Sequence, residues 1–154
     1  MMEPQISASQ LAAWESYQRM RVLLAGRINR ELARKTGLSE ADYEILSALT
    51  KTSAESMRVL ALRCELVWEK GRLSHQLRRM EARGLLTREE CVEDNRGTIV
   101  RVTEAGRRLA AEARVCYEQA VKCYVTDVLT PEQMQALGSI AKTILLQLEE
   151  PHGP

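Results

Sequence analysis

Five basic side chains between residues 70 and 83 form the clearest candidate for a binding surface. Only Glu81 opposes them in this stretch, which contains Lys70, Arg72, Arg78, Arg79 and Arg83. The whole chain has a net charge of only +1. A local excess of positive charge on a nearly neutral chain indicates a surface that meets a polyanion. Charge alone leaves open the alternative of an ordinary solvated helix face.

The stretch of residues 69–83 has the periodicity of an α-helix. Its inward side is predicted to carry Leu73, Leu77 and Met80. The outer side collects residue types that a recognition helix uses in the major groove, where Arg bonds guanine and His, Ser or Gln reach bases or phosphates. A glycine there lets the backbone approach DNA closely. The predicted DNA-contacting residues of this helix are Lys70, Gly71, Arg72, Ser74, His75, Gln76, Arg78 and Arg79. Arg83, near its end, is suited to a phosphate contact.

A predicted β-hairpin follows this helix directly. Residues 85–90 and 98–103 have strand character and flank a polar turn. An arginine at the tip, Arg96, is suited to a narrow minor groove, and Gly97 completes the turn. Asp94 is expected to orient Arg96 or a helix arginine through a salt bridge. A basic helix followed at once by such a hairpin favours DNA binding over a solvated helix face.

The elements around this surface predict a mainly α fold with a small β-hairpin wing. A helix capped by Ser39, a polar loop at 51–56 and a short helix at 59–66 precede the basic helix. Residues 39–103 are therefore predicted to form a winged helix-turn-helix domain for DNA binding. A helix capped by Ser9, which Gly37 ends, comes before this domain.

Long helices flank the winged helix without a core of their own. Residues 8–36 and 104–149 are predicted to form one intertwined dimerisation region. Within the second range, one helix is predicted to run to about residue 128, and the last helix begins at a capping box in 130–133. A helix with an apolar stripe must bury that stripe against another element. The pattern therefore predicts a homodimer.

Three segments together resemble the MarR family of winged-helix regulators: residues 68–86, the wing tip at 94–97, and Val102-Thr103-Glu104-Ala105-Gly106 after the wing. The segment from Leu38 to Leu46 resembles the family's second helix. The resemblance implies a homodimer that binds double-stranded DNA at a pseudo-palindromic operator and mostly represses transcription. It also implies release of DNA when a small phenolic or lipophilic molecule binds.

Two ways of sensing a signal are compatible with the residues. Trp14, Tyr17, Arg21 and Tyr43 are candidates for a pocket that binds a small aromatic or acidic effector, although core and dimer packing is the preferred explanation for them. A thiol-based redox response is the second possibility. Cys64 is expected beside the core, and two further cysteines, Cys116 and Cys123, are expected to be buried and unreactive, which leaves Cys91 as the most exposed thiol.

Other function classes find little support in the sequence. No apolar run is long enough to span a membrane and no signal peptide is recognised, which predicts a cytoplasmic protein without a membrane partner. No nucleophile–base pair, phosphate-binding loop or metal-ligand spacing is recognised, so we expect no enzymatic activity, cofactor or metal. The remaining alternative is a winged helix that serves only as a protein-interaction module.

Overall fold

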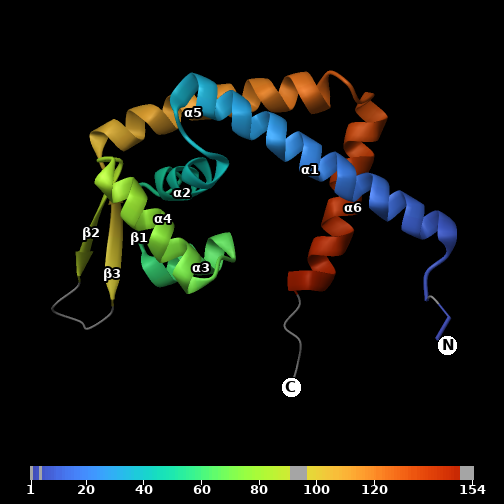
Figure 1. Ribbon diagram of the computed structural model, residues 1–154, viewed down its shortest axis with the longest axis horizontal. Helices are drawn as coiled ribbons and strands as arrows, with labels where there is room; N and C mark the ends of the chain where they lie inside the picture. The colour runs from blue at the N-terminus through green and yellow to red at the C-terminus, as the bar shows by residue number, and fades with distance from the viewer. Residues whose placement is uncertain (1, 4, 91–96, 150–154) are drawn as a thin grey trace. The chain divides into compact units, whose positions relative to one another are not determined.

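The computed structural model describes residues 2–3, 5–90 and 97–149. The chain forms two compact units, Met1–Tyr117 and Glu118–Pro154, and each is described by itself. The first unit contains, in order, α1 (Ala8–Thr36), α2 (Glu40–Thr50), β1 (Ser56–Arg58), α3 (Val59–Leu66), α4 (Lys70–Ala82), β2 (Leu86–Glu90), β3 (Thr98–Val102) and most of α5 (Glu104–Val121) (Figure 1). This order confirms the predicted mainly helical fold with a winged helix-turn-helix.

The wing contains one strand more than the sequence predicted. The three strands pair antiparallel in the order β1-β3-β2, with Met57 of β1 and Arg88 of β2 both opposite the buried Val100 of β3. Residues 51–56 were predicted as a loop, and that prediction is wrong at its end, where Ser56 begins β1. A strand of three residues is too short to show an alternating pattern, and its pairing with β3 forms only in the folded chain.

Capping residues define the ends of the first two helices. The Ser7 hydroxyl accepts a hydrogen bond from the Gln10 backbone N–H, and the Gln10 side chain accepts one from Ser7, so the capping box begins two residues earlier than the predicted Ser9 cap. Gly37 has a φ of 75° and ends α1 as predicted. Ser39 caps α2 as predicted, and Asp42 completes the box.

Aliphatic side chains from the helices of the first unit and from β2 and β3 form the core. The fully buried members include Leu32 of α1, Leu38, Leu46 of α2, Leu62 of α3, Leu73, Leu77 and Met80 of α4, Leu86 of β2 and Val100 of β3. The inward face of α4 is therefore fixed against the core, and its opposite face is turned outward.

The second unit contains the end of α5, a π-helical turn (Lys122–Thr126) and α6 (Pro131–Glu149). The sequence predicted one uninterrupted helix to about residue 128, which is wrong from residue 122 on, because the Asp127 backbone N–H there donates to the Lys122 carbonyl. Thr130 and Gln133 form the predicted capping box of α6. No residue of α6 is buried within the chain.

Candidate nucleic-acid interface

The two sides of α4 differ sharply in exposure. Leu73, Leu77 and Met80 are buried as predicted. The exposed side carries most of the predicted DNA-contacting residues, namely Lys70, Gly71, Arg72, His75, Arg78 and Arg79, with Ser74 half-buried at its edge. The periodicity of the helix therefore brings these six exposed residues to one surface, which we call the outer face of α4.

The cations on this outer face form no hydrogen bond or ion pair with the residues that the structure describes. Within the described part of the chain, the side chains of Lys70, Arg78 and Arg79 form no hydrogen bond or ion pair, and that of Arg72 has only a ring contact. Some arginines elsewhere are paired, namely Arg34 with Glu31, Arg88 with Glu81 and Arg107 with Glu55. The unpaired guanidinium groups keep their full capacity to bind an external anion.

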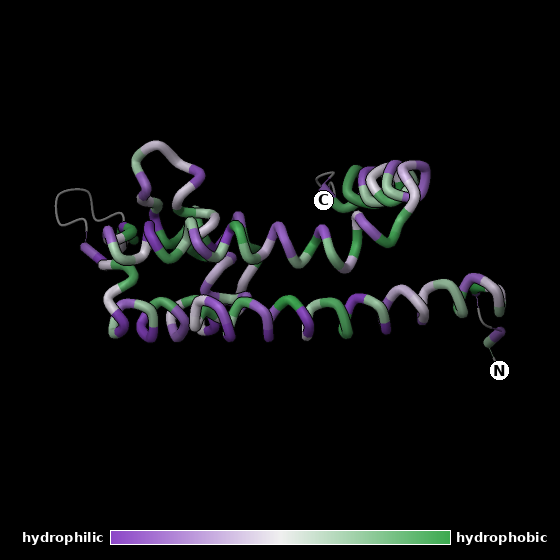
Figure 2. Tube along the Cα trace, turned by 90° about the horizontal axis from the view of Figure 1, so that it is seen from above, coloured by the Kyte–Doolittle hydropathy of each residue, from purple (hydrophilic) through white to green (hydrophobic). Residues whose placement is uncertain are grey.

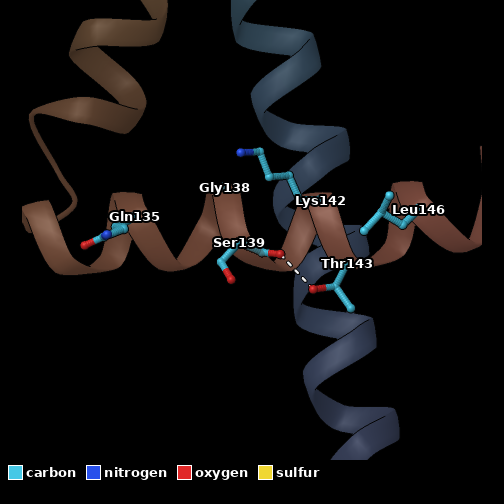
Figure 3. Close-up of a pocket in the computed structure, with 6 residues that line it drawn as sticks. All are labelled: Gln135, Gly138, Ser139, Lys142, Thr143 and Leu146. Carbon is cyan, nitrogen blue, oxygen red and sulfur yellow. Dashed lines mark hydrogen bonds between the residues drawn. The ribbon is translucent and has the colours of Figure 1, made fainter.

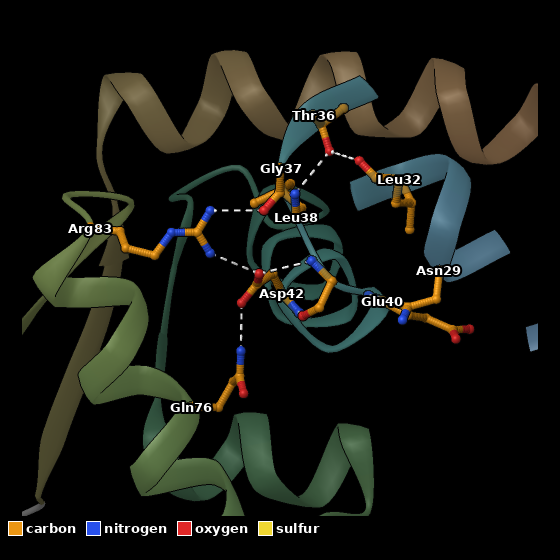
Figure 4. A network of polar contacts seen from close by, with 10 residues as sticks. Asn29, Leu32, Thr36, Gly37, Leu38, Glu40, Asp42, Gln76 and Arg83 are labelled. Atoms are coloured by element: carbon orange, nitrogen blue, oxygen red, sulfur yellow. Dashed lines mark hydrogen bonds and ion pairs between the residues drawn. The ribbon is translucent and has the colours of Figure 1, made fainter. Parts of the chain in front are cut away.

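A buried carboxylate joins α2 to α4 (Figure 4). Asp42 is only 3% exposed, and its carboxylate accepts hydrogen bonds from the Ser39 backbone, from the Gln76 side-chain amide and from Arg83, at 3.0 Å. The same guanidinium donates to the carbonyl oxygen of Gly37. Two side chains predicted to contact DNA, those of Gln76 and Arg83, are thus committed to this internal network.

The base of the wing is joined to α4 by an ion pair. The Arg88 guanidinium lies 3.0 Å from the Glu81 carboxylate, and the Arg88 backbone N–H also donates to that carboxylate. Hydrogen bonds from the Arg88 side chain hold the pKa of Glu81 below its usual value. Gly97 is exposed with a φ of 87°, which suits a turn residue. The predicted wing-tip residues Asp94 and Arg96 lie outside the described residues.

The corner between the wing and α5 is closely packed. The Thr103 hydroxyl donates to the Gly84 carbonyl at 2.7 Å and accepts from the Gly106 backbone N–H at 3.0 Å. The Thr103 N–H donates to the Leu85 carbonyl. A Cβ on Gly106 would overlap the Leu85 carbonyl oxygen, which is why this position requires glycine.

Comparisons with solved structures agree with this architecture. The structure matches AbsC, a MarR family transcriptional regulator from Streptomyces coelicolor, with a TM-score of 0.86 and 29% identity, over 95% of this chain and 98% of that one. It matches Sco3205, a MarR family regulator from the same organism solved in complex with DNA, with a TM-score of 0.87 and 29% identity, over 95% of each chain. In fold and in sequence, the chain is therefore similar to MarR family transcriptional regulators.

A sequence relative supports the same similarity. The chain is 25% identical over 107 residues to the uncharacterized HTH-type transcriptional regulator YdgJ of Bacillus subtilis (strain 168). That match covers 70% of this chain and 64% of the length of the Bacillus protein. No model of a known protein family matches the chain. The predicted resemblance is confirmed, and with it the prediction of a transcriptional regulator instead of an enzyme.

The predicted effector residues lie in two separate places. The rings of Trp14 and Tyr17 are 5.3 Å apart on the exposed side of α1, and the side chain of Arg21 donates to Gln18. Tyr43 instead stacks on Tyr117 of α5, with 4.8 Å between the ring centroids.

A long segment of α1 separates these two places. The start of α2, next to Tyr43, is anchored to α1 by Asn29, whose side chain accepts from the Glu40 N–H. Asn29 lies about 22 Å along the helix axis from Trp14. Burial raises the pKa of Tyr117, and the nearby charges of Glu40 and Glu44 raise it further. The negative charge of these two carboxylates disfavours an acidic ligand beside Tyr117.

Six residues of α6 line a shallow depression along one side of that helix: Gln135, Gly138, Ser139, Lys142, Thr143 and Leu146 (Figure 3). The Thr143 hydroxyl donates to the Ser139 carbonyl, so it is engaged within the helix. All six residues come from one helix, and this depression therefore does not enclose a ligand.

The thiols lie differently from the prediction. Cys116 is buried as expected, whereas Cys64 and Cys123 are exposed in the chain, because each occupies a helix position that faces away from the core. Cys91 lies outside the described residues.

Among the described residues, no group of three His, Cys, Asp or Glu side chains could hold a metal ion. No helix in the same part of the chain is long and apolar enough to cross a membrane.

The turn between α3 and α4 contains a strained residue that sequence reasoning missed. Val67 has a φ of 56°, a left-handed conformation that a β-branched residue rarely adopts, and its side chain is 87% exposed. Nothing in the amino-acid pattern marks this position, where glycine or asparagine is the usual choice. The next residue, Trp68, is buried.

The substitution Val67→Gly is expected to raise the free energy of unfolding by about 1 kcal/mol, because relief of left-handed strain exceeds the entropy that glycine adds to the unfolded chain. Urea unfolding at fixed protein concentration measures the change. Val128→Gly is the matched control, since Val128 is also exposed but has no positive φ. An equal loss of stability in both variants would contradict the assignment of strain.

Proposed function

We propose that this regulator is a homodimer that binds a pseudo-palindromic DNA operator in a sequence-specific manner and represses transcription. In this proposal α4 enters the major groove and the wing follows the adjacent minor groove. The observation that carries the proposal is the outer face of α4, where four cations gather that form no hydrogen bond or ion pair with the described residues.

The composition of this face fits a duplex better than a protein partner. Arg72 and Arg78 are suited to bidentate bonds with guanine, and Lys70 to a phosphate. His75 lies on the same exposed side. Because Sco3205 was solved in complex with DNA and shares 29% identity across 95% of the chain, its complex supports the same mode of binding here.

Uncovered apolar faces support the homodimer. On α1 the exposed hydrophobic residues include Leu11, Trp14 and Met20, and on α6 they include Ile140, Ile144 and Leu148. Figure 2 shows hydrophobic residues recurring along both helices. Large exposed apolar patches mark protein interfaces, and an isologous interface would cover the same patch on both copies.

Arg78→Ala is expected to weaken binding to a selected operator by roughly 5- to 150-fold, because a bidentate base contact contributes about 1–3 kcal/mol. Selection of bound sequences from random DNA supplies the operator, and gel shifts at several salt concentrations give the affinities. Lys70→Ala is expected to weaken binding equally on all sequences and to lower the salt slope by about 1.

Arg34→Ala is the matched control for these variants. Arg34 is an exposed arginine paired with Glu31 at the end of α1, outside the outer face of α4. Affinity unchanged in Arg34→Ala and lost in Arg78→Ala supports the proposal. If no duplex is selected from random DNA, a winged helix that serves only as a protein-interaction module is favoured. Binding to DNA that ignores salt and all three substitutions would overturn the role of the outer face of α4.

The proposal includes a small aromatic or acidic effector that releases DNA. The Trp14–Tyr17 pair on α1 offers an aromatic surface, with Arg21 one turn further along the same helix. Titrating aromatic carboxylates and uncharged phenols into the protein–DNA complex separates the two effector classes. A second candidate, a thiol-responsive regulator, is favoured by the exposure of Cys64 and Cys123 and requires that iodoacetamide label the native protein.

A further inference from the structure

The indole ring of Trp68 lies directly against one cation of the outer face of α4. The guanidinium carbon Cζ of Arg72 is 3.8 Å from the ring centroid. Trp68 is only 7% exposed, whereas Arg72 is exposed. A guanidinium over an indole face is held by the negative charge of the ring face, and tryptophan is the best aromatic partner for this contact.

The backbone of Trp68 is fixed on both sides. Its N–H donates to the Arg63 carbonyl oxygen, and its own carbonyl accepts a hydrogen bond from the Arg63 Nε, each at 3.3 Å. The preceding Val67 is held in the left-handed conformation that turns the chain from α3 into α4. Because the ring is buried and its peptide is anchored, the ring is the fixed member of the pair and Arg72 is the member that is positioned.

Stacking leaves Arg72 able to bind a ligand with its edges. A separation of 3.8 Å between Cζ and the ring centroid fits a contact through the flat face of the guanidinium, whose five N–H groups lie in its plane. Within the described residues, Arg72 donates to no protein acceptor. Lys70, Arg78 and Arg79 have no ring contact within the described residues, so each must lose side-chain conformational freedom when it binds DNA. Arg72 has already lost much of this freedom by stacking on Trp68.

We propose that Trp68 is a positioning residue that orients Arg72 in advance for a bidentate contact with a base edge carrying two acceptors, as guanine does. This inference rests on the proposed DNA binding and assigns a role that the outer face of α4 alone does not reveal. The inference predicts an energetic coupling between the two residues, in which Trp68 contributes to DNA affinity only through Arg72.

A double-mutant cycle tests this coupling on the selected operator. Trp68→Leu, which keeps an apolar side chain but removes the ring, is expected to raise the dissociation constant about three- to tenfold. In the Arg72→Ala background the same substitution is expected to change nothing further. In the Arg78→Ala background, the matched control, it is expected to keep its full effect.

A second measurement avoids any loss of folding in Trp68→Leu. Fluorinated tryptophans keep the shape of the ring but withdraw charge from its face, and Trp14→Phe leaves Trp68 as the single tryptophan of the chain. Affinity for the operator is expected to fall stepwise with the number of fluorine atoms, and to stay constant when Arg72 is replaced by Ala.

The outcomes separate this inference from the proposed function. If the unmodified protein binds no duplex selectively, both fail together. If it binds and Arg78→Ala weakens binding, but the Trp68→Leu effect persists in Arg72→Ala or fluorination leaves affinity unchanged, DNA binding stands and the positioning role is overturned.

Discussion

Gly106→Ala is expected to lower the free energy of unfolding by about 3 kcal/mol, because the added methyl group would overlap a backbone carbonyl. The overlapping atom is the Leu85 oxygen, and the Leu85 carbonyl carbon and the Val102 Cγ1 follow at 3.0 and 3.1 Å from the same Cβ position. A side chain could rotate away, but a backbone atom moves only with its whole segment.

That segment has little freedom to move. The Leu85 N–H donates to the Met80 carbonyl, and the Leu85 oxygen accepts from the Thr103 N–H. The Thr103 hydroxyl, meanwhile, bridges the Gly84 carbonyl and the Gly106 N–H. Moving α5 away from the wing would therefore break several bonds at once.

Gly26→Ala is the matched control for this prediction. Gly26 also lies within a helix, but a Cβ there meets nothing within 4 Å. Because alanine is the better helix former, this variant is expected to gain about 0.5–1 kcal/mol. Urea unfolding followed by far-UV circular dichroism, at one protein concentration, measures both. A Gly106→Ala variant as stable as Gly26→Ala would mean that this corner is not closely packed.

Asp42→Ala is expected to cost about 2–3 kcal/mol, since it leaves three donors without their acceptor. These donors are the Ser39 N–H, the Gln76 amide and the Arg83 guanidinium. The full cost of breaking a buried ion pair does not apply, because the Arg83 side chain is 43% exposed and water can solvate its charge.

Two further variants show which part of the Asp42 interaction matters. Asp42→Asn keeps a side-chain oxygen but removes the charge, and is expected to cost about 1 kcal/mol. Glu31→Ala breaks a surface ion pair with Arg34, whose side chain is 70% exposed, and is expected to cost under about 1 kcal/mol. If Asp42→Ala costs no more than Glu31→Ala in the same urea experiment, the network contributes little to stability.

Local patterns were sufficient to predict the elements and the outer face of α4. The spacing of Leu73, Leu77 and Met80 identified the inward side of that helix, because helical periodicity depends only on nearby residues. The same reason explains why the Ser39 cap and the capping box of α6 were predicted correctly. The exposed positions of the cations that carry the proposed function follow from this periodicity.

Contacts between residues distant in the sequence were decided by the tertiary structure. Asp42 accepts hydrogen bonds from Gln76 and Arg83, which lie 34 and 41 residues further along the sequence. No periodicity or motif indicates that these two polar side chains of the basic helix bind an internal carboxylate. Likewise, β1 is a strand only because β3 lies beside it.

The amino-acid sequence by itself determined the helix order, the caps of α2 and α6, the outer face of α4 and the family resemblance, because each depends on interactions within a few residues. Only the tertiary structure decided that Gly106 must lack a side chain and that Trp68 lies under Arg72. Both depend on where separate segments of backbone come to rest, which the packing of the whole core sets.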